Sequence, residues 1–280
     1  MLCLKYKQNK VTIIILTYNE QIHIKRCIKS VYSIADNIIV IDSFSSDKTL
    51  QICKRFKKIK IYQRKFKHQA DQMNWALKNL KIKNDWIFRI DADEYLCNFN
   101  KNFFLKKLNN KKINGYLITR KIKFLGKTIN YGLTSPHKTL RIWRNSKGYY
   151  ENLSVDEQVV VKGKISSLDY LIIDENLKGF LFWIRKHISY SKREAIEYYK
   201  FKKINLKKED LSKVNKFKKY KIYYKFPIFV RPLLLFIYSY FFKLGFMNGV
   251  QGLIFNFFQI LIYRFVVDIN IFLKKNTFSK

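Results

Sequence analysis

Three carboxylates come almost side by side in the sequence DWIFRIDADEYL, residues 85–96. They are Asp91, Asp93 and Glu94. Grouped carboxylates repel an anion unless a hard divalent cation such as Mg²⁺ or Mn²⁺ lies between them, and such a cation binds carboxylate and phosphate oxygens together. The spacing therefore indicates a cation site that can hold a diphosphate. On its own, D-x-D is a weak signal, because Asp also favours turns and helix starts.

The residues before this group are apolar and predict a buried strand that ends at Asp91. Two earlier apolar runs, VTIIIL at residues 11–16 and IIVID at residues 38–42, predict further strands, and the polar sequences TYNE and SFSSD follow them. In an open α/β sheet, ligands bind beyond the carboxyl ends of the parallel strands. The residues expected to meet at that edge are Thr17, Tyr18, Asn19, Glu20, Asp42, Asp47, Asp91 and Asp93.

Stretches with helical periodicity separate these strands, for example QADQMNWALKNL at residues 69–80. This alternation predicts an α/β fold with a mostly parallel sheet and helices on both faces. From residue 115 onward, the runs GYLITRKIKFLG, KTLRIWRN and EQVVVKG predict strands without long helices between them, and hence a mixed or antiparallel extension of the sheet. From residue 177 the pattern becomes helical, so we expect domains at residues 1–175 and 176–280.

Several kinds of site find no support in the sequence. The turn after the first strand lacks glycine, so neither G-x-G-x-x-G nor a Walker loop is present to bind phosphate. The cysteines, Cys3, Cys27, Cys53 and Cys97, show no paired metal-ligand spacing. Because MLCLKYKQNK has no apolar run of a secretory signal, we expect free thiols and a reducing cytoplasmic compartment.

The chain carries a formal net charge of +36, which by itself suggests nucleic acid or an anionic membrane surface as partner. Toprim-type nucleic-acid enzymes also place a glutamate after a first strand and a D-x-D after a later one. Their glutamate is followed by Gly, whereas Glu20 is followed by Gln21 here. This departure argues against the Toprim class, so we expect no nucleic-acid partner. A basic, Toprim-like nucleic-acid-processing metalloenzyme is kept as the alternative hypothesis.

The last hundred residues favour a membrane surface. Residues 181–225 hold 15 Lys or Arg against 4 Asp or Glu, and strongly aromatic helices follow. A basic segment beside aromatic helices is typical of a surface that lies on an anionic bilayer. Residues 244–263 form a charge-free run of 20 that could span a membrane, but their Gly, Asn and Gln content favours peripheral attachment. A soluble helical subdomain is the remaining alternative.

The motifs VTIIILTYNE, IIVIDSFSSDKT, QADQMNWAL and DWIFRIDADE together resemble those of family-2 glycosyltransferases with the GT-A fold. The resemblance is greatest to the bacterial subgroup that builds lipopolysaccharide cores and related surface glycans. It continues through HKTLRIWRN, SVDEQVVVKG, WIRKHISYSKREA and RPLLLFIYSYFFKLGFMNG, and so covers nearly the whole chain.

The resemblance implies roles for individual residues. Thr17, Tyr18, Glu20 and Asp42 would border the nucleoside, with Asp42 facing a uracil N–H. Asp91 would lie near the ribose and the metal, and Asp93 would ligate the Mg²⁺ or Mn²⁺ that bridges the diphosphate. The subgroup has Val-His-Glu where this chain has Val155, Asp156 and Glu157. Glu157 is thus the candidate general base, with Asp156 beside it as a departure from the pattern.

The implied reaction is inverting transfer of a sugar, UDP-hexose being the expected donor, to a lipopolysaccharide-core or other lipid-linked glycan. The implied location is the cytoplasmic face of the bacterial inner membrane, with peripheral attachment through a membrane-associated helical region. Two departures concern the acceptor side. Asp174 replaces a histidine of the subgroup, and residues 245–249 read GFMNG where GFLDG is usual.

Overall fold

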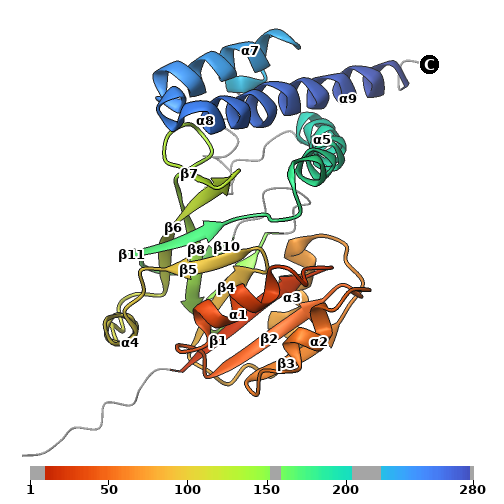
Figure 1. Cartoon of the computed structure of the whole chain (residues 1–280). Coiled ribbons are helices and arrows are strands. Elements are labelled where there is room, and N and C mark those ends of the chain that lie inside the picture. Colours follow the sequence, from red (N-terminus) through yellow and green to blue (C-terminus); the bar gives the residue numbers. More distant parts are fainter. Residues whose placement is uncertain (1–9, 152–158, 204–221, 278–280) are drawn as a thin grey trace, which may run out of the picture. The chain divides into compact units, whose positions relative to one another are not determined.

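The computed structural model describes residues 10–151, 159–203 and 222–277. The chain folds as two compact units, one formed by Met1–Ile122 with His137–Leu177 and the other by Lys123–Pro136 with Lys178–Lys280. The first unit holds a large sheet with flanking helices, and the second is mainly helical (Figure 1). The division into domains 1–175 and 176–280 stays a prediction, because the segment 123–136 groups with the helical unit.

The main sheet has the strand order β3-β2-β1-β4-β8-β6-β11-β5, with β7 paired to β6 outside this order. A small second sheet pairs β10 with β9. The strands are β1 (Val11–Thr17), β2 (Asn37–Asp42), β3 (Ile59–Gln63), β4 (Trp86–Asp91), β5 (Glu94–Cys97), β6 (Gly115–Phe124), β7 (Lys127–Ile129), β8 (His137–Arg144), β9 (Gly148–Tyr150), β10 (Val159–Val161) and β11 (Ile165–Asp174).

Strands β3, β2, β1 and β4 run parallel, as the alternation of strand and helix patterns predicted. The other half of the sheet is mixed, because β8 runs antiparallel to both β4 and β6, and β11 is parallel to β6 but antiparallel to β5. The sequence patterns do not predict β5 or β11. β5 is short and follows the DAD motif directly, whereas β11 shows no clean alternation of polar and apolar residues.

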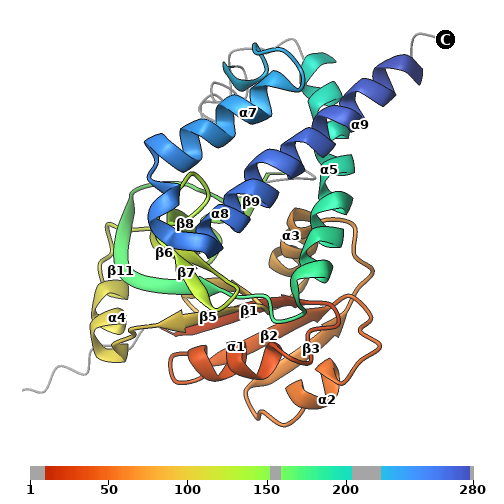
Figure 2. The same ribbon diagram turned by 45° about the horizontal axis from the view of Figure 1, so that its top comes forward.

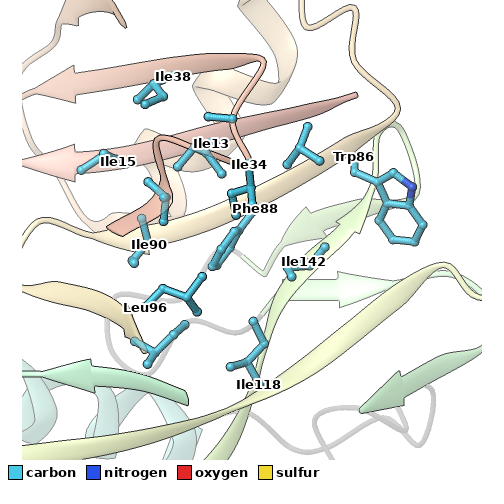
Figure 3. Close-up of a cluster of buried hydrophobic side chains, with 14 of the residues drawn as sticks. Ile13, Ile15, Ile34, Ile38, Trp86, Phe88, Ile90, Leu96, Ile118 and Ile142 are labelled. Carbon is cyan, nitrogen blue, oxygen red and sulfur yellow. The ribbon is translucent and has the colours of Figure 1, made fainter. Parts of the chain in front are cut away.

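Helices cover both faces of the sheet (Figure 2). Side chains alternate along each strand, so Ile13 and Ile15 of β1 pack toward one helix layer and Ile14 toward the other. The first layer includes α1 and α4 and produces the larger core cluster, part of which is drawn in Figure 3. The second layer is α3. The helices of this unit are α1 (Ile24–Val31), α2 (Thr49–Cys53), α3 (Gln69–Asn79) and α4 (Lys101–Leu108).

Among the described residues from Phe180 onward the second unit is helical, in agreement with the helical character expected from residue 177. One helical run, Gly245–Lys274, is long and apolar enough by length and composition to cross a membrane. The elements are α5 (Phe180–Lys203), α7 (Val230–Ile237), the π-helical turn η1 (Tyr238–Phe242), the 3₁₀ turn η2 (Gly245–Asn248), α8 (Gly249–Asn256), the π-helical segment η3 (Phe257–Ile262) and α9 (Tyr263–Thr277).

Candidate active site

The ends of three parallel strands bring predicted site residues together. In the register of the sheet, Thr17 of β1 pairs with Asp42 of β2, and Leu16 of β1 pairs with Asp91 of β4. Neighbouring strands lie about 4.8 Å apart, so the backbones of Asp42 and Asp91 flank the end of β1 about 10 Å from each other. The two aspartates therefore lie on either side of the end of β1.

The loops after β1 and β2 are tied to each other by hydrogen bonds. Asn19 adopts a left-handed backbone conformation (φ 53°), and its N–H donates to Ser45 Oγ at 2.8 Å. In return, the Ser46 N–H donates to Asn19 Oδ1 at 2.8 Å. The paired loops present two aromatic rings, because Tyr18 and Phe44 are 57% and 58% exposed. The structure thus offers two flat apolar surfaces beside the carboxylates.

Asp42 is fully buried and its carboxylate is held by the loop that follows it. It accepts hydrogen bonds from the Ser45 N–H at 2.8 Å, from Ser45 Oγ at 2.5 Å and from Gln63 Nε2 at 3.2 Å. Thr17 beside it is also buried, and its Oγ1 finds no hydrogen-bond partner among the described residues. A buried hydroxyl without a partner is costly unless a ligand or water satisfies it.

Glu20 supports the loop from within the fold. Its carboxylate lies 2.5 Å from Nδ1 of the fully buried His23, and its N–H donates to Thr49 Oγ1 at 2.8 Å. His23 Nε2 accepts the Leu177 N–H at 2.7 Å, so the ring proton is on Nδ1 and points at Glu20. The direct contact predicted between Glu20 and the nucleoside stays a prediction.

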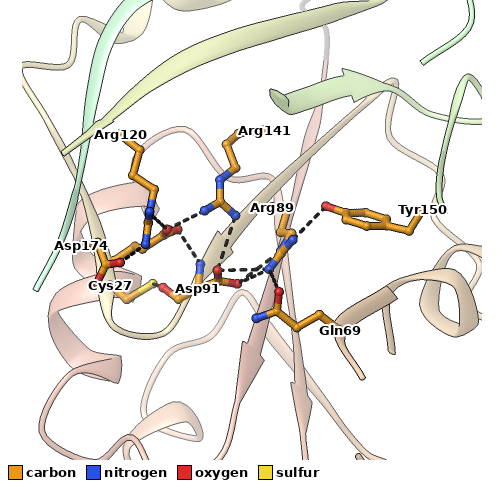
Figure 4. Close-up of polar contacts among 9 residues, drawn as sticks. Cys27, Gln69, Arg89, Asp91, Arg120, Arg141, Tyr150 and Asp174 are labelled. Carbon is orange, nitrogen blue, oxygen red and sulfur yellow. Dashed lines mark hydrogen bonds and ion pairs between the residues drawn. The ribbon is translucent and has the colours of Figure 1, made fainter. Parts of the chain in front are cut away.

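Asp91 is bound by two arginines (Figure 4). Arg89, a buried residue on the same strand, donates from Nε at 3.2 Å and from Nη2 at 2.9 Å to Asp91 Oδ1. Arg141 of β8 brings Nη1 to 3.5 Å from Asp91 Oδ2. Arg89 also donates to Gln69 Oε1 at 2.8 Å and to the Tyr150 hydroxyl at 3.3 Å. It thereby joins β4 to the start of α3 and to β9.

Glu94 forms the second part of the same network. It is almost fully buried, and its Oε1 accepts from Arg120 Nε at 2.9 Å and from Arg141 Nη2 at 2.5 Å. Its Oε2 accepts the Asp91 N–H at 3.0 Å, which fixes the turn between β4 and β5. Arg120 also pairs with Asp174. Three arginines therefore balance Asp91, Glu94 and Asp174.

The network sets the ionisation of its carboxyls. Burial works to raise the pKa of Asp91, but Arg89 and Arg141 outweigh it and hold the pKa of this carboxyl below its ordinary value. Burial raises the pKa of Glu94, with the charge of Asp91 acting in the same direction. Cys27 donates to the Asp91 carbonyl at 3.4 Å, and burial beside Glu94 and Asp91 raises the pKa of its thiol. Cys27 is therefore a protonated thiol and no candidate nucleophile.

A comparison with protein-family models matches residues 12–156 to "Glycosyl transferase family 2". The chain belongs to glycosyl transferase family 2. The family predicted from the motifs is thus confirmed, and the mixed sheet between two helix layers is the GT-A fold that it implied. Membership also decides against the Toprim-like alternative.

Curated relatives of this family 2 chain carry glycosyltransferase names. An uncharacterized glycosyltransferase of Rickettsia bellii is 41% identical over 87 residues, 31% of this chain and 29% of the relative. SunS of Bacillus subtilis is 27% identical over 230 residues, 71% of this chain and 54% of SunS. LpsC of Rhizobium meliloti, a lipopolysaccharide core biosynthesis glycosyltransferase, is 27% identical over 163 residues, 55% of this chain and 58% of LpsC. The chain thus spans less than two thirds of each of these relatives.

Solved structures of glycosyltransferases also resemble this chain. Residues 1–349 of TarS of S. aureus, crystallised with UDP-GlcNAc, are 19% identical with a TM-score of 0.45, and the match covers 71% of this chain and 68% of that TarS fragment. Glucosyl-3-phosphoglycerate synthase of Mycobacterium tuberculosis, crystallised with Mn²⁺, UDP and glucosyl-3-phosphoglycerate, is 18% identical with a TM-score of 0.33, and the match covers 40% of this chain and 44% of the synthase.

The donor set of this family 2 site fits a divalent cation shared with a diphosphate. Asp93 stands half-buried in the turn after β4, two residues beyond Asp91. Within residues 10–151, 159–203 and 222–277, no group of three His, Cys, Asp or Glu side chains is placed to hold a metal ion by itself. Mg²⁺ is commonly bound through one or two carboxylates plus substrate phosphates, so the pair of aspartates suits it.

Two predicted catalytic residues, Asp156 and Glu157, lie outside the described residues. The strand that precedes them is firmly placed, since Tyr150 exchanges backbone hydrogen bonds with the Asn74 side chain of α3 at 2.8 and 2.9 Å.

Sequence reasoning missed four residues of the site. Arg89 gives a signal as a charged residue within an apolar strand, whereas the other three give none: Phe44, Arg120 and Arg141.

Proposed function

We propose that this family 2 glycosyltransferase moves a sugar, with inversion, from a nucleotide-diphosphate sugar to a lipopolysaccharide-core or other lipid-linked glycan. A UDP-hexose is the proposed donor. The observation that carries the proposal is the register of the sheet, which sets Asp42 and Asp91 on either side of the end of β1. Ligands of open α/β sheets bind beyond the carboxyl ends of the parallel strands, and a carboxylate there can accept hydrogen bonds from the base or the ribose of a nucleoside.

The nucleoside binds at the paired loops after β1 and β2. Asp42 accepts the uracil N–H, and Tyr18 and Phe44 supply exposed rings on which the base stacks. The buried hydroxyl of Thr17, which has no hydrogen-bond partner among the described residues, is a further group proposed to bind the nucleoside. Glu20 orders this loop through His23 and so keeps Tyr18 in place.

The diphosphate and the metal belong at the turn between β4 and β5. Asp93 and Asp91 would hold Mg²⁺ or Mn²⁺ there, and the bound cation would stabilise the charge that develops on the departing diphosphate. Asp93, the second aspartate of the D-A-D motif, is the proposed principal ligand of the metal, and Arg89 and Arg141 hold Asp91 beside it.

Glu157 is the proposed general base, with Asp156 beside it. A glutamate has a reference pKa of about 4.3 and is ionised at neutral pH, so it can take the proton of the acceptor hydroxyl without any change in its pKa. The hydroxyl oxygen then attacks the anomeric carbon from the face opposite the leaving diphosphate. The β9 strand, anchored to α3 through Asn74, leads directly into the segment that carries both residues.

The proposed acceptor is carried on a lipid at the cytoplasmic face of the inner membrane, to which the chain attaches peripherally. LpsC acts in lipopolysaccharide core biosynthesis and shares 27% identity with this chain. The apolar helices of the second unit and the net charge of +36 support attachment to an anionic surface.

A transfer assay tests the proposal. Purified protein is incubated with Mn²⁺, a panel of radiolabelled nucleotide sugars and lipid-linked glycans extracted from a bacterial envelope. We expect label in the lipid fraction only with one class of nucleotide sugar and only while the divalent cation is present. Label transfer that is unchanged in the presence of EDTA would contradict the metal site, and the absence of any transfer or donor hydrolysis would contradict the function.

A further inference from the structure

The second unit contains a helical hairpin whose inner side is polar. Arg231 of the first arm bonds to Asp268 of the second arm, and Ser239, later in the first arm, bonds to Asn256, which is earlier in the second. The two arms are therefore antiparallel. Arg231 Nε donates to Asp268 Oδ1 at 2.9 Å, and Ser239 Oγ donates to Asn256 Oδ1 at 2.6 Å. All four side chains are nearly or fully buried. The hairpin is thus held together by polar groups that are satisfied inside it.

The end of the hairpin is fixed in the same way. Asn248 is buried, and its Oδ1 accepts the Asn130 N–H at 2.8 Å and the Tyr131 N–H at 3.2 Å. Its Nδ2 donates to the carbonyls of Tyr131 at 2.9 Å and Gly245 at 3.0 Å. Asn248 and Asn256, two of the polar residues that count against a lipid-facing helix in the sequence, therefore point inward. The exposed side chains of the hairpin are mainly apolar.

We define the hairpin face as the exposed apolar side chains between Phe229 and Phe257. Phe242 and Val250 are the most exposed of them, at 73% and 68%. Within this stretch the charged residues are Arg231, which is buried, and Lys243. The face consists of Phe229, Val230, Leu233, Leu234, Ile237, Tyr238, Phe241, Phe242, Leu244, Phe246, Met247, Val250, Leu253 and Phe257.

This distribution is the reverse of that on a water-soluble helix, where the apolar stripe packs inward and polar side chains face solvent. A soluble monomer rarely exposes an apolar patch larger than a few hundred Å², and larger patches mark an interface with a membrane or another protein. The charge of the unit selects between these two. Residues 123–136 and 178–280 together hold 24 Lys or Arg against 5 Asp or Glu, which favours an anionic lipid surface and opposes pairing of two copies.

We infer that the hairpin face inserts into the cytoplasmic headgroup and acyl boundary of an anionic bilayer, and that the hairpin lies along this boundary without crossing it. The inference deepens the proposed peripheral attachment by naming the surface that makes it, and it rests on the proposed function for the side of the membrane. Lys243 lies 5.5 Å from the Tyr238 ring centre, and a Cβ at Gly249 would stand 3.1 Å from Lys127 Nζ. Both lysines therefore border the face, where they can reach lipid phosphates.

Geometry opposes a spanning arrangement. The arm Val230–Phe242 has 13 residues and measures about 20 Å, against about 30 Å for the hydrocarbon core. The longer run Gly245–Lys274 would have to leave its partners in order to cross. Asp268 would lose Arg231, and Tyr263 would lose the hydrogen bond that its hydroxyl donates to Glu194 at 2.6 Å.

Binding to vesicles tests the inference. The full chain is mixed with vesicles of phosphatidylcholine alone or with 30% phosphatidylglycerol and then floated on a density gradient. We expect binding to the anionic vesicles, and a loss of at least about 10-fold in the partition coefficient for Phe241→Ser/Phe242→Ser, because each buried aromatic contributes strongly to apolar transfer. Leu181→Ser is the matched control, since Leu181 is 69% exposed on α5 of the same unit.

The depth of insertion gives a second measurement with conservative variants. The added tryptophan of Phe242→Trp should be quenched more strongly by lipids brominated near the headgroup than by lipids brominated near the bilayer centre. The added tryptophan of Leu181→Trp should be quenched by neither. Strongest quenching by lipids brominated near the bilayer centre would overturn the interfacial arrangement. Equal vesicle binding by Phe241→Ser/Phe242→Ser and wild type would also overturn the inference. So would sedimentation that shows a wild-type dimer in the absence of lipid and a monomer for this variant.

These experiments use no sugar donor, so a failure of the proposed reaction leaves their outcome unchanged. Binding of UDP to the Phe241→Ser/Phe242→Ser variant, measured by calorimetry, is expected to match wild type within about 2-fold. Loss of vesicle binding with donor binding retained would support the hairpin face as a membrane surface.

Discussion

Arg89 and Asp91 stand two residues apart on β4 and form a two-pronged ion pair, with Nη2 of the arginine 2.9 Å from Oδ1 and 3.1 Å from Oδ2 of the aspartate. Side chains two residues apart on a strand point to the same face, so the pair follows from the sequence R-I-D itself. Arg141 adds a second positive charge at 3.5 Å. The Asp91 carboxylate is thus ionised, and two arginines hold it in a fixed position and balance its charge.

Removing Arg89 should destabilise the fold. Loss of one partner of a buried ion pair costs about 3–5 kcal/mol, and since Arg141 remains we expect the lower end of this range for Arg89→Met. Arg89→Lys should recover part of the loss, because it restores the charge without the two-pronged contact. Urea unfolding measures both. The exposed Arg55→Met is the control, and an Arg89→Met protein as stable as this control would contradict the role given to the pair.

The ionisation of Asp91 predicts a pH dependence of stability. The pKa of Asp91 is lower in the folded protein than its ordinary value of 3.8, so its charged form stabilises the fold above that pH. The contribution is lost as the pH falls through the lowered folded-state pKa. Wild type should therefore exceed Asp91→Asn in the free energy of unfolding at pH 7, and the gap should narrow below about pH 3.8. A gap that widened on acidification would show the opposite sign.

Phe44 is expected to contribute to donor binding. Its ring is exposed on the loop after β2, and stacking of a base on an aromatic side chain contributes about 1–3 kcal/mol. Phe44→Ala should therefore raise the Kd for UDP about 10-fold, as measured by calorimetry. Phe103→Ala on α4 removes a similarly apolar exposed ring and should leave this Kd unchanged. Equal Kd values for UDP in Phe44→Ala and Phe103→Ala would show that Phe44 does not contribute to donor binding.

The sequence predicted the parallel half of the sheet and the edge at which the site lies. Strong apolar runs fixed β1, β2 and β4, and the rule that ligands bind beyond parallel strand ends then placed Asp42 and Asp91 together. The arginine network escaped prediction because its contacts join distant segments. Arg141 and Glu94 lie 47 residues apart, and Arg120 and Asp174 lie 54 apart.

Asp174 shows why local patterns fail here. The sequence marks it only as a departure from the related subgroup, on a strand that no pattern predicts. In the structure Asp174 pairs with Arg120, and Arg120 also donates to Glu94. Asp174 therefore helps to balance the positive charge of the arginine that holds the turn after β4. Asn248 is a comparable departure in the second unit, and it fixes the segment that begins at Asn130.

The proposed base can be separated from its neighbour by kinetics. Glu157→Gln should lower kcat by about 10²–10⁴ with little change in KM for the donor, because the loss concerns proton removal from the acceptor. Asp156→Asn should have the smaller effect. The measurement is initial-rate transfer at saturating acceptor. A larger loss for Asp156→Asn than for Glu157→Gln would reverse the two assignments.

The end of β4 is proposed to form a metal-dependent nucleotide-sugar site, and the binding of UDP with and without Mn²⁺ tests this proposal most directly. Calorimetry on wild type should show that Mn²⁺ tightens UDP binding at least about 10-fold. Asp93→Asn should abolish this gain, and Asp169→Asn, an exposed carboxylate on β11, should retain it. UDP affinity that does not depend on Mn²⁺ in wild type, or an undiminished Mn²⁺ effect in Asp93→Asn, would contradict the account.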